Sequence, residues 1–329
     1  MLVFDAKPYD RESLDEAAGD DLELHYLEAN LSPATAELAR GFPVICAFVN
    51  DDLGADTMQR LAAVGVRLVA MRCSGYNNVD LEAAAHRGIS VVRVPAYSPE
   101  AVAEHTMALI LTLNRKIHRA YNRVRDGNFS LAGLVGFNLH GRTAGIVGLG
   151  AIGRALAVNL QGFGMEILAS DPALDHAAAD NLGVQAVELD ELLSLANVVS
   201  LHAPLFPATY HLLDRERLAS MKPGAMLINT SRGGLVDTAA LIDSLKSGHL
   251  GAAGLDVYEE EADYFFEDRS GVVIEDDVLA RLMTFPNVIV TSHQAFLTRE
   301  ALAEIASTTV ISIRAFIAGR ELKYRVSAR

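Results

Sequence analysis

The stretch TAGIVGLGAIGRALAVNLQGFGMEILASD, residues 143–171, gives the clearest indication of the fold. It begins as an apolar strand, turns through Gly148, Gly150 and Gly153 in the order G-x-G-x-x-G, and continues as a helix followed by a second strand. Such glycines permit a tight turn, close approach of a pyrophosphate and close packing of helix on sheet, with the helix N-terminus facing the phosphates. The alternative is a glycine-rich turn that binds nothing. The register of all four elements favours a dinucleotide site.

The second strand of this stretch ends at Asp171, about 20 residues after the glycine turn, where dinucleotide sites place an acid on the ribose hydroxyls. A carboxylate at this position accepts hydrogen bonds from both hydroxyls and repels a 2′-phosphate. The sequence therefore predicts NAD, rather than NADP, as the cofactor.

Short apolar runs alternate with helical patterns along nearly the whole chain. Most runs are continuous in Val, Ile, Leu and Ala, which is typical of parallel strands buried on both faces. We expect an α/β protein with two doubly wound domains. The expected strands are MLVFDA, ELHYLE, VICAFVN, VRLVAMR and SVVRV near the N-terminus, and TAGIVGLG, MEILASD, VQAV, NVVSLHA, AMLINTS, GAAGLDV and NVIVTS after residue 140.

Two long helical segments complete the pattern. Residues 98–125 are expected to form one helix that Ser98 caps, and the all-round apolar run MALILTL indicates that this helix is buried between larger bodies. Residues 298–319 are expected to form a closing helix that stops at Gly319.

Composition argues against several classes of protein. The net charge of −14 disfavours binding to a nucleic-acid backbone, which needs basic surface. No apolar run reaches the roughly 18 residues of a membrane span, and the N-terminus lacks the pattern of a signal peptide. The two cysteines, Cys46 and Cys73, are expected as buried thiols of a cytoplasmic protein. No Cys/His cluster has metal spacing, so no metal is expected.

Three later strand ends carry an arginine, an acid run and a histidine. Arg232 follows AMLINTS, Glu259–Glu261 follow GAAGLDV, and His293 follows NVIVTS. Because the carboxyl ends of parallel strands meet at one edge of a sheet, we expect these groups to meet where the dinucleotide binds.

Together these groups predict a hydride-transfer site. Arg232 would bind a substrate carboxylate bidentately, His293 would donate a proton to a carbonyl oxygen, and a paired carboxylate would stabilise the imidazolium. Each group alone has an ordinary explanation: a surface ion pair for the arginine, a structural role for the histidine and a solvated loop for the acids. Spacing alone does not choose among the three acids.

The order of these motifs is similar to that of a known family. GLGAIGR with its later SD, HAPL, NTSRGG, GLDVYEEE and SHQAF resemble the D-isomer-specific 2-hydroxyacid dehydrogenases. RCSGYNNVD, PAYSPEAVAEH, GFNLHGRTAGIVGLG, YFFEDRS and HQAFLT resemble the fermentative D-lactate dehydrogenases among them. The resemblance covers essentially the whole chain. It implies a Rossmann NAD-binding domain at 99–298, inserted into a flavodoxin-like catalytic domain formed by residues 1–98 and 299–329.

The resemblance also assigns site residues. The family's catalytic glutamate lies five positions after the aspartate of LDV, which selects Glu261 as the partner of His293 and leaves Glu259 and Glu260 as solvated loop. The aspartate itself, Asp256, would contact the nicotinamide side of NAD. The further cofactor contacts that the resemblance implies are Ala151, Ile152, Ala203, Pro204, Thr209, Thr230 and Ser231.

For the substrate, the resemblance implies two kinds of contact. Backbone N–H groups near Ser74 and Gly75 would hold the carboxylate together with Arg232, while Tyr97 and Phe296 would enclose a methyl group. The alternative for each aromatic residue is ordinary core packing.

Two positions depart from the family pattern. Many relatives have proline before the catalytic histidine, whereas this chain has Ser292, which leaves the chain at His293 less rigidly set. Some lactate enzymes carry an arginine near the N-terminus that helps to bind carboxylate, and this chain has Lys7 in that vicinity. Both departures bear on substrate preference rather than on reaction class.

The resulting hypothesis is a cytoplasmic, NAD-dependent enzyme that reduces pyruvate to D-lactate. Its partner would be a small 2-keto or 2-hydroxy acid, with no nucleic acid or membrane, and the family implies a homodimer or homotetramer. One alternative is a reductase of hydroxypyruvate, glyoxylate or a branched-chain keto acid. Another is a NAD-sensing binding protein like the corepressors built on this fold, from which fast turnover would distinguish an enzyme.

Overall fold

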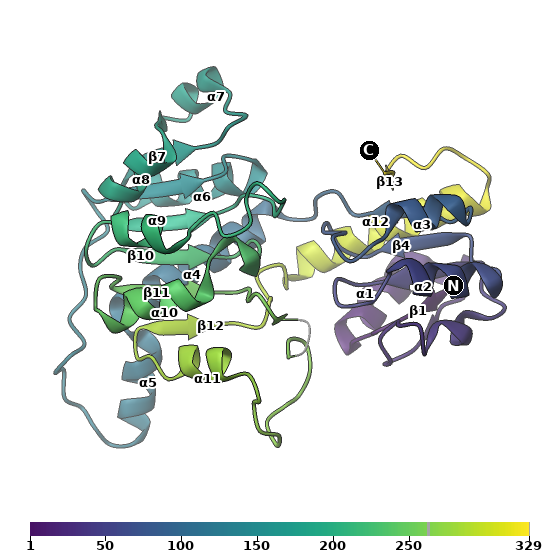
Figure 1. Cartoon of the computed structure of the whole chain (residues 1–329), viewed down its shortest axis with the longest axis horizontal. Coiled ribbons are helices and arrows are strands. Elements are labelled where there is room, and N and C mark those ends of the chain that lie inside the picture. Colours follow the sequence, from purple (N-terminus) through teal and green to yellow (C-terminus); the bar gives the residue numbers. More distant parts are fainter. Residues whose placement is uncertain (262–263, 329) are drawn as a thin grey trace. The chain divides into compact units, whose positions relative to one another are not determined.

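The computed structural model describes residues 1–261 and 264–328, and the chain divides into two compact units (Figure 1). One unit comprises Met1–Ser98 and Phe296–Arg329, and the other comprises Pro99–Ala295. Each is a doubly wound α/β structure, which confirms the fold class expected from the sequence. The last residue of the chain, Arg329, lies outside the described residues.

The unit Pro99–Ala295 is built on a parallel seven-stranded sheet. Its strand order is β12-β11-β10-β9-β6-β7-β8, so the winding reverses between β6 and β9. Doubly wound proteins bind dinucleotides at the carboxyl ends of the strands beside such a switch point. The strands are β6 (Thr143–Val147), β7 (Glu166–Ser170), β8 (Gln185–Ala186), β9 (Val198–Leu201), β10 (Met226–Asn229), β11 (Ala252–Leu255) and β12 (Val288–Val290).

Helices cover both faces of this sheet. On one face lie α4 (Pro99–Arg115) and α6 (Ala151–Gly162), which pack against each other. On the other face lie α8 (Leu189–Leu195), α9 (Arg215–Ser220) and α10 (Thr238–Lys246). Other helices among the described residues of the unit are α5 (Ile117–Arg125), α7 (His176–Asn181), α11 (Asp277–Met283) and the 3-10 turn η3 (Gly233–Leu235).

The strands are apolar along their length because both faces of the sheet are buried. In β6, Ile146 packs in the core beneath α4 and α6, while the next residue, Val147, packs in the core beneath α8, α9 and α10. In β9, Val198 and Val199 divide in the same way. Two separate cores therefore explain the continuous apolar runs seen in the sequence.

The segment 98–125 forms two helices, so the expectation of one helix is wrong. Lys116 has a left-handed backbone conformation, with φ 51°, and separates α4 from α5. In α4, Leu109 and Ile110 are buried, whereas no residue of α5 is buried. The apolar run that predicted burial belongs to α4 alone, and lysine at the break carries no helix-stop signal.

The unit formed by both chain ends contains a six-stranded sheet with the order β13-β5-β4-β3-β1-β2. Its first five strands are parallel in the flavodoxin-like order 2-1-3-4-5, and β13 joins β5 in the antiparallel sense. The strands are β1 (Leu2–Val3), β2 (His25–Tyr26), β3 (Val44–Ala47), β4 (Leu68–Met71), β5 (Ser90–Arg93) and β13 (Arg325–Val326).

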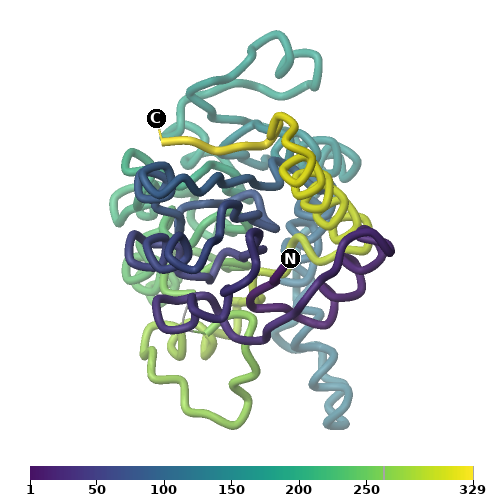
Figure 2. The backbone as a smooth tube through the Cα atoms, turned by 90° about the vertical axis from the view of Figure 1, so that its right-hand side faces the viewer, coloured from purple at the N-terminus to yellow at the C-terminus, as the bar shows by residue number. Residues whose placement is uncertain are grey.

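The closing helix, α12 (Arg299–Ile317), packs along α1 (Pro8–Ala18) of the N-terminal segment (Figure 2). The side chain of Thr298 caps α12. The chain leaves the helix through Gly319 with φ 64°, and this stop was predicted from the sequence. On the sheet side, Ile313 belongs to a core that includes Val44, Leu68, Ala70 and Val92. The smaller helices are α2 (Ala55–Ala63), α3 (Leu81–His86), η1 (Gly19–Asp21) and η2 (Ala36–Ala39).

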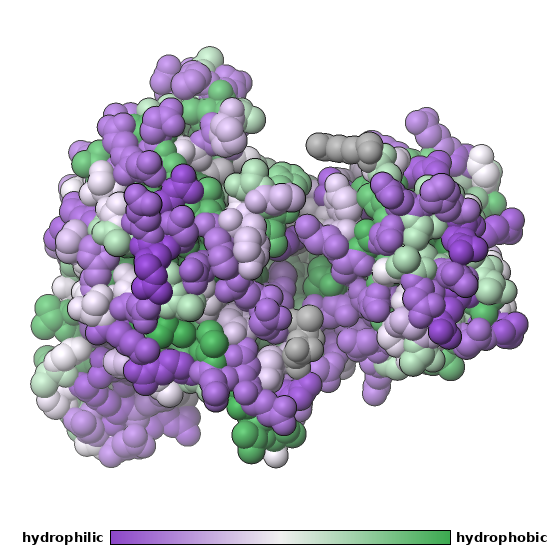
Figure 3. All heavy atoms as spheres, viewed as in Figure 1, coloured by the Kyte–Doolittle hydropathy of each residue, from purple (hydrophilic) through white to green (hydrophobic). Residues whose placement is uncertain are grey.

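The surface, the helices and the cysteines each bear on an expectation drawn from composition. Hydrophilic residues dominate the face shown in Figure 3. In the described part of the chain, no helix has both the length and the apolar character needed to cross a membrane. Cys46 and Cys73 are buried thiols, not a disulfide.

Candidate active site

The glycine turn joins β6 to the N-terminus of α6. Gly148 has φ 94°, and a Cβ there would lie 2.8 Å from the carbonyl carbon of His202, so glycine is required. A Cβ on Gly153 would collide with the carbonyl oxygen of Gly148, which explains the close packing of helix on strand. A Cβ on Gly150 would meet nothing within 4 Å. The backbone at Gly150 is therefore open to a pyrophosphate at the start of α6, whose first residues are Ala151 and Ile152.

Asp171 follows β7 and faces the glycine turn. One carboxylate oxygen accepts from the N–H of Leu149 at 2.8 Å, and the other accepts from the N–H of Ala173 at 2.8 Å. These bonds hold a negative charge beside the turn, where it suits ribose hydroxyls and opposes a 2′-phosphate. The open backbone at Gly150 and this fixed acid fit NAD.

The loop after β9 contains three of the residues expected beside the cofactor, Ala203, Pro204 and Thr209. The hydroxyl of Thr209 donates to the carbonyl oxygen of Pro204 at 2.7 Å, which closes the loop on itself. The hydroxyl of Ser231 donates to the carbonyl oxygen of Ala203 at 2.7 Å. The loops after β9 and β10 are thus bonded together at the edge of the sheet that carries the glycine turn.

Two polar residues near this edge are bonded inside the unit. The buried hydroxyl of Thr230 lies 3.0 Å from the hydroxyl of Thr106 on α4. His202, which the sequence did not single out, has Nε2 at 2.8 Å from the hydroxyl of Ser200, and burial lowers the pKa of His202 to about 4. The imidazole of His202 is therefore neutral at physiological pH.

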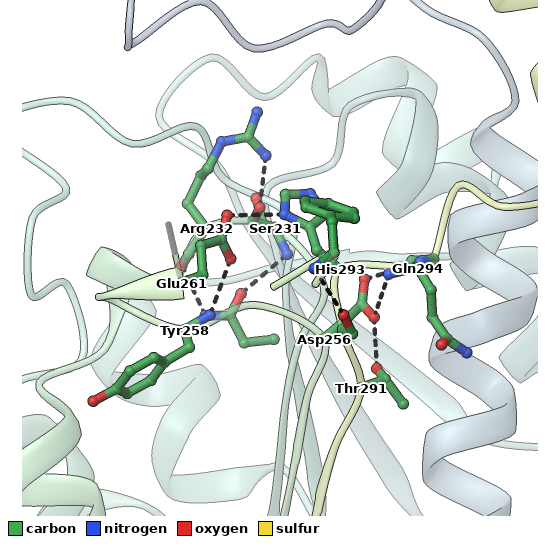
Figure 4. A network of polar contacts seen from close by, with 12 residues as sticks. Ser231, Arg232, Asp256, Tyr258, Glu261, Thr291, His293 and Gln294 are labelled. Atoms are coloured by element: carbon green, nitrogen blue, oxygen red, sulfur yellow. Dashed lines mark hydrogen bonds and ion pairs between the residues drawn. The ribbon is translucent and has the colours of Figure 1, made fainter. Parts of the chain in front are cut away.

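Arg232, Glu261 and His293 follow β10, β11 and β12 and lie close together (Figure 4). Oε1 of Glu261 lies 2.9 Å from Nδ1 of His293, and Oε2 accepts from the N–H of Tyr258 at 3.2 Å. The second bond orients the carboxylate toward the imidazole. The guanidinium of Arg232 donates to the carbonyl oxygen of Ser231 at 2.6 Å, which uses one of its five N–H groups.

The backbone around His293 is unusual. His293 has φ 49° and Phe266 has φ 68°, both in the left-handed region that non-glycine residues seldom adopt. The two rings pack with their centroids 5.8 Å apart, and the N–H of Phe266 donates to the hydroxyl of Ser292 at 3.4 Å. Ser292, the departure from the family's proline, thus connects the segment of Phe266 to the residue before His293. Left-handed residues of this kind cluster at functional sites.

Asp256 holds the turn that carries His293. It is fully buried, and its carboxylate accepts from the hydroxyl of Thr291 and from the N–H groups of Gln294 and Ala295, each N–H at 2.9 Å (Figure 4). Its carbonyl oxygen accepts from the N–H of His293 at 2.7 Å. Both carboxylate oxygens of Asp256 thus have partners within the unit. Contact of Asp256 with nicotinamide stays a prediction.

His105 on α4 supports the same carboxylate. Its Nε2 lies 3.4 Å from Oδ1 of Asp256 and 3.1 Å from the hydroxyl of Thr291. Burial alone would raise the pKa of Asp256, but hydrogen bonds from His105, Thr291 and Gln294 outweigh burial, and the pKa is lowered. Asp256 is therefore ionised at neutral pH. No local pattern could reveal His105, because its partner lies far along the chain.

The three acids of the run 259–261 have three different environments. Oε1 of Glu259 lies 2.7 Å from Nε2 of His211, and Oε2 accepts from the N–H of Thr238 at 3.1 Å. The expectation that Glu259 is solvated loop is therefore wrong, because the turn after β11 brings its carboxylate to the start of α10. Glu260 is exposed, as expected, and Glu261 faces His293.

Apart from Arg232, the residues expected to contact substrate lie in the unit formed by both chain ends. Ser74 and Gly75 follow β4, and Tyr97 follows β5. The ring of Phe296 is buried, with its centroid 6.2 Å from that of Tyr97 and 6.1 Å from that of Phe48, which follows β3. The sequence analysis did not single out Phe48, because an aromatic residue at the end of a strand is usually part of the hydrophobic core.

Lys7, the cation near the N-terminus, has an acidic partner. Its ammonium lies 2.8 Å from Oδ1 of Asp5, whose side chain is buried. The charge of Lys7 is thus largely balanced within its own segment. In residues 1–261 and 264–328, no group of three or more His, Cys, Asp or Glu side chains is arranged to hold a metal ion.

The unit Pro99–Ala295 thus combines a dinucleotide turn with an arginine and a carboxylate–histidine pair at the same sheet edge. This combination can anchor an anionic substrate and move a proton where hydride is transferred. It defines a NAD-dependent oxidoreductase.

Comparisons with known proteins agree with this class. Residues 107–295 match the family described as D-isomer specific 2-hydroxyacid dehydrogenase, NAD binding domain. The chain is 52% identical over 321 residues to a 2-hydroxyacid dehydrogenase homolog of Haemophilus influenzae, covering 97% of each chain. It is 50% identical over 311 residues to D-lactate dehydrogenase of Escherichia coli, covering 94% of each chain.

A solved structure, described as the pyruvate reductase of Chlamydomonas reinhardtii, is similar with a TM-score of 0.92 and 44% identity, over 98% of this chain and 97% of that one. The chain belongs to the D-isomer-specific 2-hydroxyacid dehydrogenases. Its cofactor is NAD, in agreement with the fit of the glycine turn and Asp171.

Proposed function

We propose that the protein is a NAD-dependent D-lactate dehydrogenase that works mainly as a pyruvate reductase. The observation that carries this proposal is the Glu261–His293 pair, with 2.9 Å between Oε1 and Nδ1, beside Arg232 at the edge that carries the glycine turn. The relative of Escherichia coli named D-lactate dehydrogenase and the structure named pyruvate reductase support the choice of substrate.

The proposed mechanism assigns one task to each side chain. When bound at the glycine turn, NADH would supply the hydride that reduces the carbonyl carbon. Arg232 binds the substrate carboxylate through two parallel N–H groups and so fixes the keto acid in one orientation. His293 donates the proton on Nε2 to the carbonyl oxygen, since Nδ1 is engaged by Glu261. Glu261 orients the imidazole and stabilises its protonated form.

We assign substrate binding to the unit Met1–Ser98 and Phe296–Arg329, and cofactor binding to the unit Pro99–Ala295, so that the second boundary lies three residues before the one expected from the sequence, 298/299. Backbone N–H groups at Ser74 and Gly75 are the proposed donors to the carboxylate, and the rings of Tyr97 and Phe296 are the proposed apolar contacts for a methyl group. The clustering of these residues after β4 and β5, with Phe296 packed against Tyr97, supports this assignment.

The direct test is NADH oxidation by purified protein with a panel of 2-keto acids. We expect the highest kcat/KM with pyruvate, and slower reaction with hydroxypyruvate, glyoxylate and branched-chain acids. Faster reaction with one of these would reassign the substrate within the family. No turnover with any of them would contradict the proposal and favour a NAD-sensing binding protein.

We also propose a homodimer or homotetramer formed through residues 117–135. Large apolar side chains are exposed on α5 and the chain after it, including Tyr121 (59%), Phe129 (75%), Leu131 (79%) and Val135 (84%). Exposed apolar clusters commonly mark protein–protein contacts. Light scattering is expected to give an oligomer, and the double variant Phe129→Ser, Leu131→Ser is expected to reduce it to a monomer. A monomeric parent protein would contradict this proposal.

Localisation in the cytoplasm is part of the same proposal. It is supported by the two buried thiols, Cys46 and Cys73, which suit a reducing compartment. Fractionation of the cells that produce the protein tests it, and enrichment in an extracellular or membrane fraction would contradict it.

A further inference from the structure

We propose that Glu259 is a positioning residue whose carboxylate ties together the loops after β9, β10 and β11 and thereby fixes Glu261 against His293. This inference rests on the proposed function, because it takes the roles of Glu261 and His293 from there. It concerns an acid for which the sequence predicted no role.

The carboxylate of Glu259 is held on two sides. Oε2 accepts from the N–H of Thr238 at 3.1 Å and from the hydroxyl of the same residue, while Oε1 lies 2.7 Å from Nε2 of His211. Thr238 is the first residue of α10, so the carboxylate meets an N–H that has no partner within the helix. The side chain of Glu259 is only 20% exposed, which shelters these charge-assisted bonds.

His211 connects Glu259 to the loop that follows Arg232. Its N–H donates to the carbonyl oxygen of Gly234 at 2.8 Å, and its ring stacks on Tyr210 with centroids 4.0 Å apart. The backbone of His211 is left-handed, with φ 49°, a conformation that its surroundings must maintain. Through His211, the carboxylate holds the end of the β9 loop against η3.

The loops after β10 and β11 also touch directly. A Cβ on Gly233 would collide with the backbone of Tyr258 and Glu259. Gly233, the residue after Arg232, therefore packs directly against the backbone of the loop after β11. A movement of the backbone at Glu259 would therefore displace the chain beside Arg232, since close-packed backbone leaves no room to absorb it.

In the run of three acids after β11, Glu259 lies two residues before Glu261, the partner of His293. The N–H of Tyr258 donates to Oε2 of Glu261 at 3.2 Å, and Oε1 of Glu261 faces His293 at 2.9 Å. Release of the Glu259 carboxylate would free the turn from α10 and loosen this alignment. Glu260, between them, is exposed and makes no bond to any residue that the structure describes, so it provides a matched control.

The test compares Glu259→Ala with Glu260→Ala in the full-length protein. For Glu259→Ala we expect kcat for pyruvate reduction to fall, by as much as the roughly 100-fold that a misplacement of about 1 Å can cost. Glu260→Ala is expected to keep the parent kcat.

A Glu259→Ala protein with the kcat of Glu260→Ala would overturn the inference, even if its thermal stability fell. If Glu259→Ala does not fold, Glu259→Gln keeps an oxygen for the N–H of Thr238 and loses the charge. It should then show a smaller change in the same direction, and no change would also overturn the inference.

A crystal structure of the variant separates failure of this inference from failure of the proposed function. Lengthening of the distance between Oε1 of Glu261 and Nδ1 of His293 is expected whatever the substrate. Retention of the present 2.9 Å would reject the positioning role alone. A parent protein that reduces no keto acid would reject the proposed function, and the distance would still decide the role of Glu259.

Discussion

Oε1 of Glu261 and Nδ1 of His293 lie 2.9 Å apart, at the ends of two neighbouring strands of one sheet. Because the carboxylate engages Nδ1, the other ring nitrogen, Nε2, is the one that can donate to a substrate. Both residues belong to the unit Pro99–Ala295, so the pair is assembled within the unit that carries the glycine turn. The proton donor and its orienting acid therefore need no residue from the rest of the chain to meet.

Replacement of His293 tests its role as the proton donor. In His293→Gln, kcat for pyruvate reduction is expected to fall by about 10²–10⁴-fold, the usual contribution of a positioned acid or base. The dissociation constant for NADH, measured by fluorescence titration, is expected to stay near the parent value, because the glycine turn is untouched. Near-parental turnover by the variant would exclude His293 as the donor.

Replacement of Arg232 tests the carboxylate anchor. Lysine keeps the charge of arginine but cannot form two parallel bonds, so Arg232→Lys should lower kcat/KM for pyruvate by about 10–100-fold, equivalent to about 1.5–3 kcal/mol. The exposed Arg215, which pairs with Asp243 on the surface, supplies a control in Arg215→Lys. Equal values of kcat/KM for pyruvate in Arg232→Lys and Arg215→Lys would contradict the role of Arg232 in binding the carboxylate.

Replacement of Asp171 tests the choice between the two nicotinamide cofactors. Asp171→Asn keeps an oxygen for the N–H of Leu149 but removes the negative charge that opposes a 2′-phosphate. The ratio of kcat/KM for NADH to that for NADPH is expected to fall by about tenfold or more, as loss of about 1.4 kcal/mol of discrimination requires. An unchanged ratio would show that discrimination lies elsewhere.

The lowered pKa of Asp256 predicts how the free energy of unfolding depends on pH. A carboxylate whose pKa is lower in the folded chain stabilises the fold above its unfolded pKa of about 4, and this stabilisation is lost as pH falls through the lowered value. Asp256→Asn should lower the free energy of unfolding at pH 7 by about 1.5–3 kcal/mol and should flatten its decline in acid. Urea unfolding between neutral and acid pH measures both effects, and a variant with the parent's acid decline would refute this assignment.

The strand pattern could be predicted because it depends on burial alone. Each of the expected apolar runs contains a strand, as in AMLINTS with Met226–Asn229 and VQAV with Gln185–Ala186. The strand Arg325–Val326 was missed because it is short, lies at the sheet edge and is largely polar. The break at Lys116 was missed because a single left-handed residue leaves no trace in hydrophobic periodicity.

The site was predictable only in part, for a different reason. Gly148 and Asp171 belong to one local motif whose spacing is set by strand–turn–helix geometry, so the sequence could indicate their partnership. The choice of Glu261 over Glu259 depended on family resemblance, because the direction of each side chain is set by contacts with distant segments. The bonds of Glu259 to His211 and Thr238, and of His105 to Asp256, arise only when separate strand-end loops meet.

The central claim is tested most directly by the handedness of the product that the purified protein forms from pyruvate and NADH. Chiral chromatography of the product should give D-lactate in an amount equal to the NADH oxidised. Formation of L-lactate, or of no lactate at all, would contradict the account.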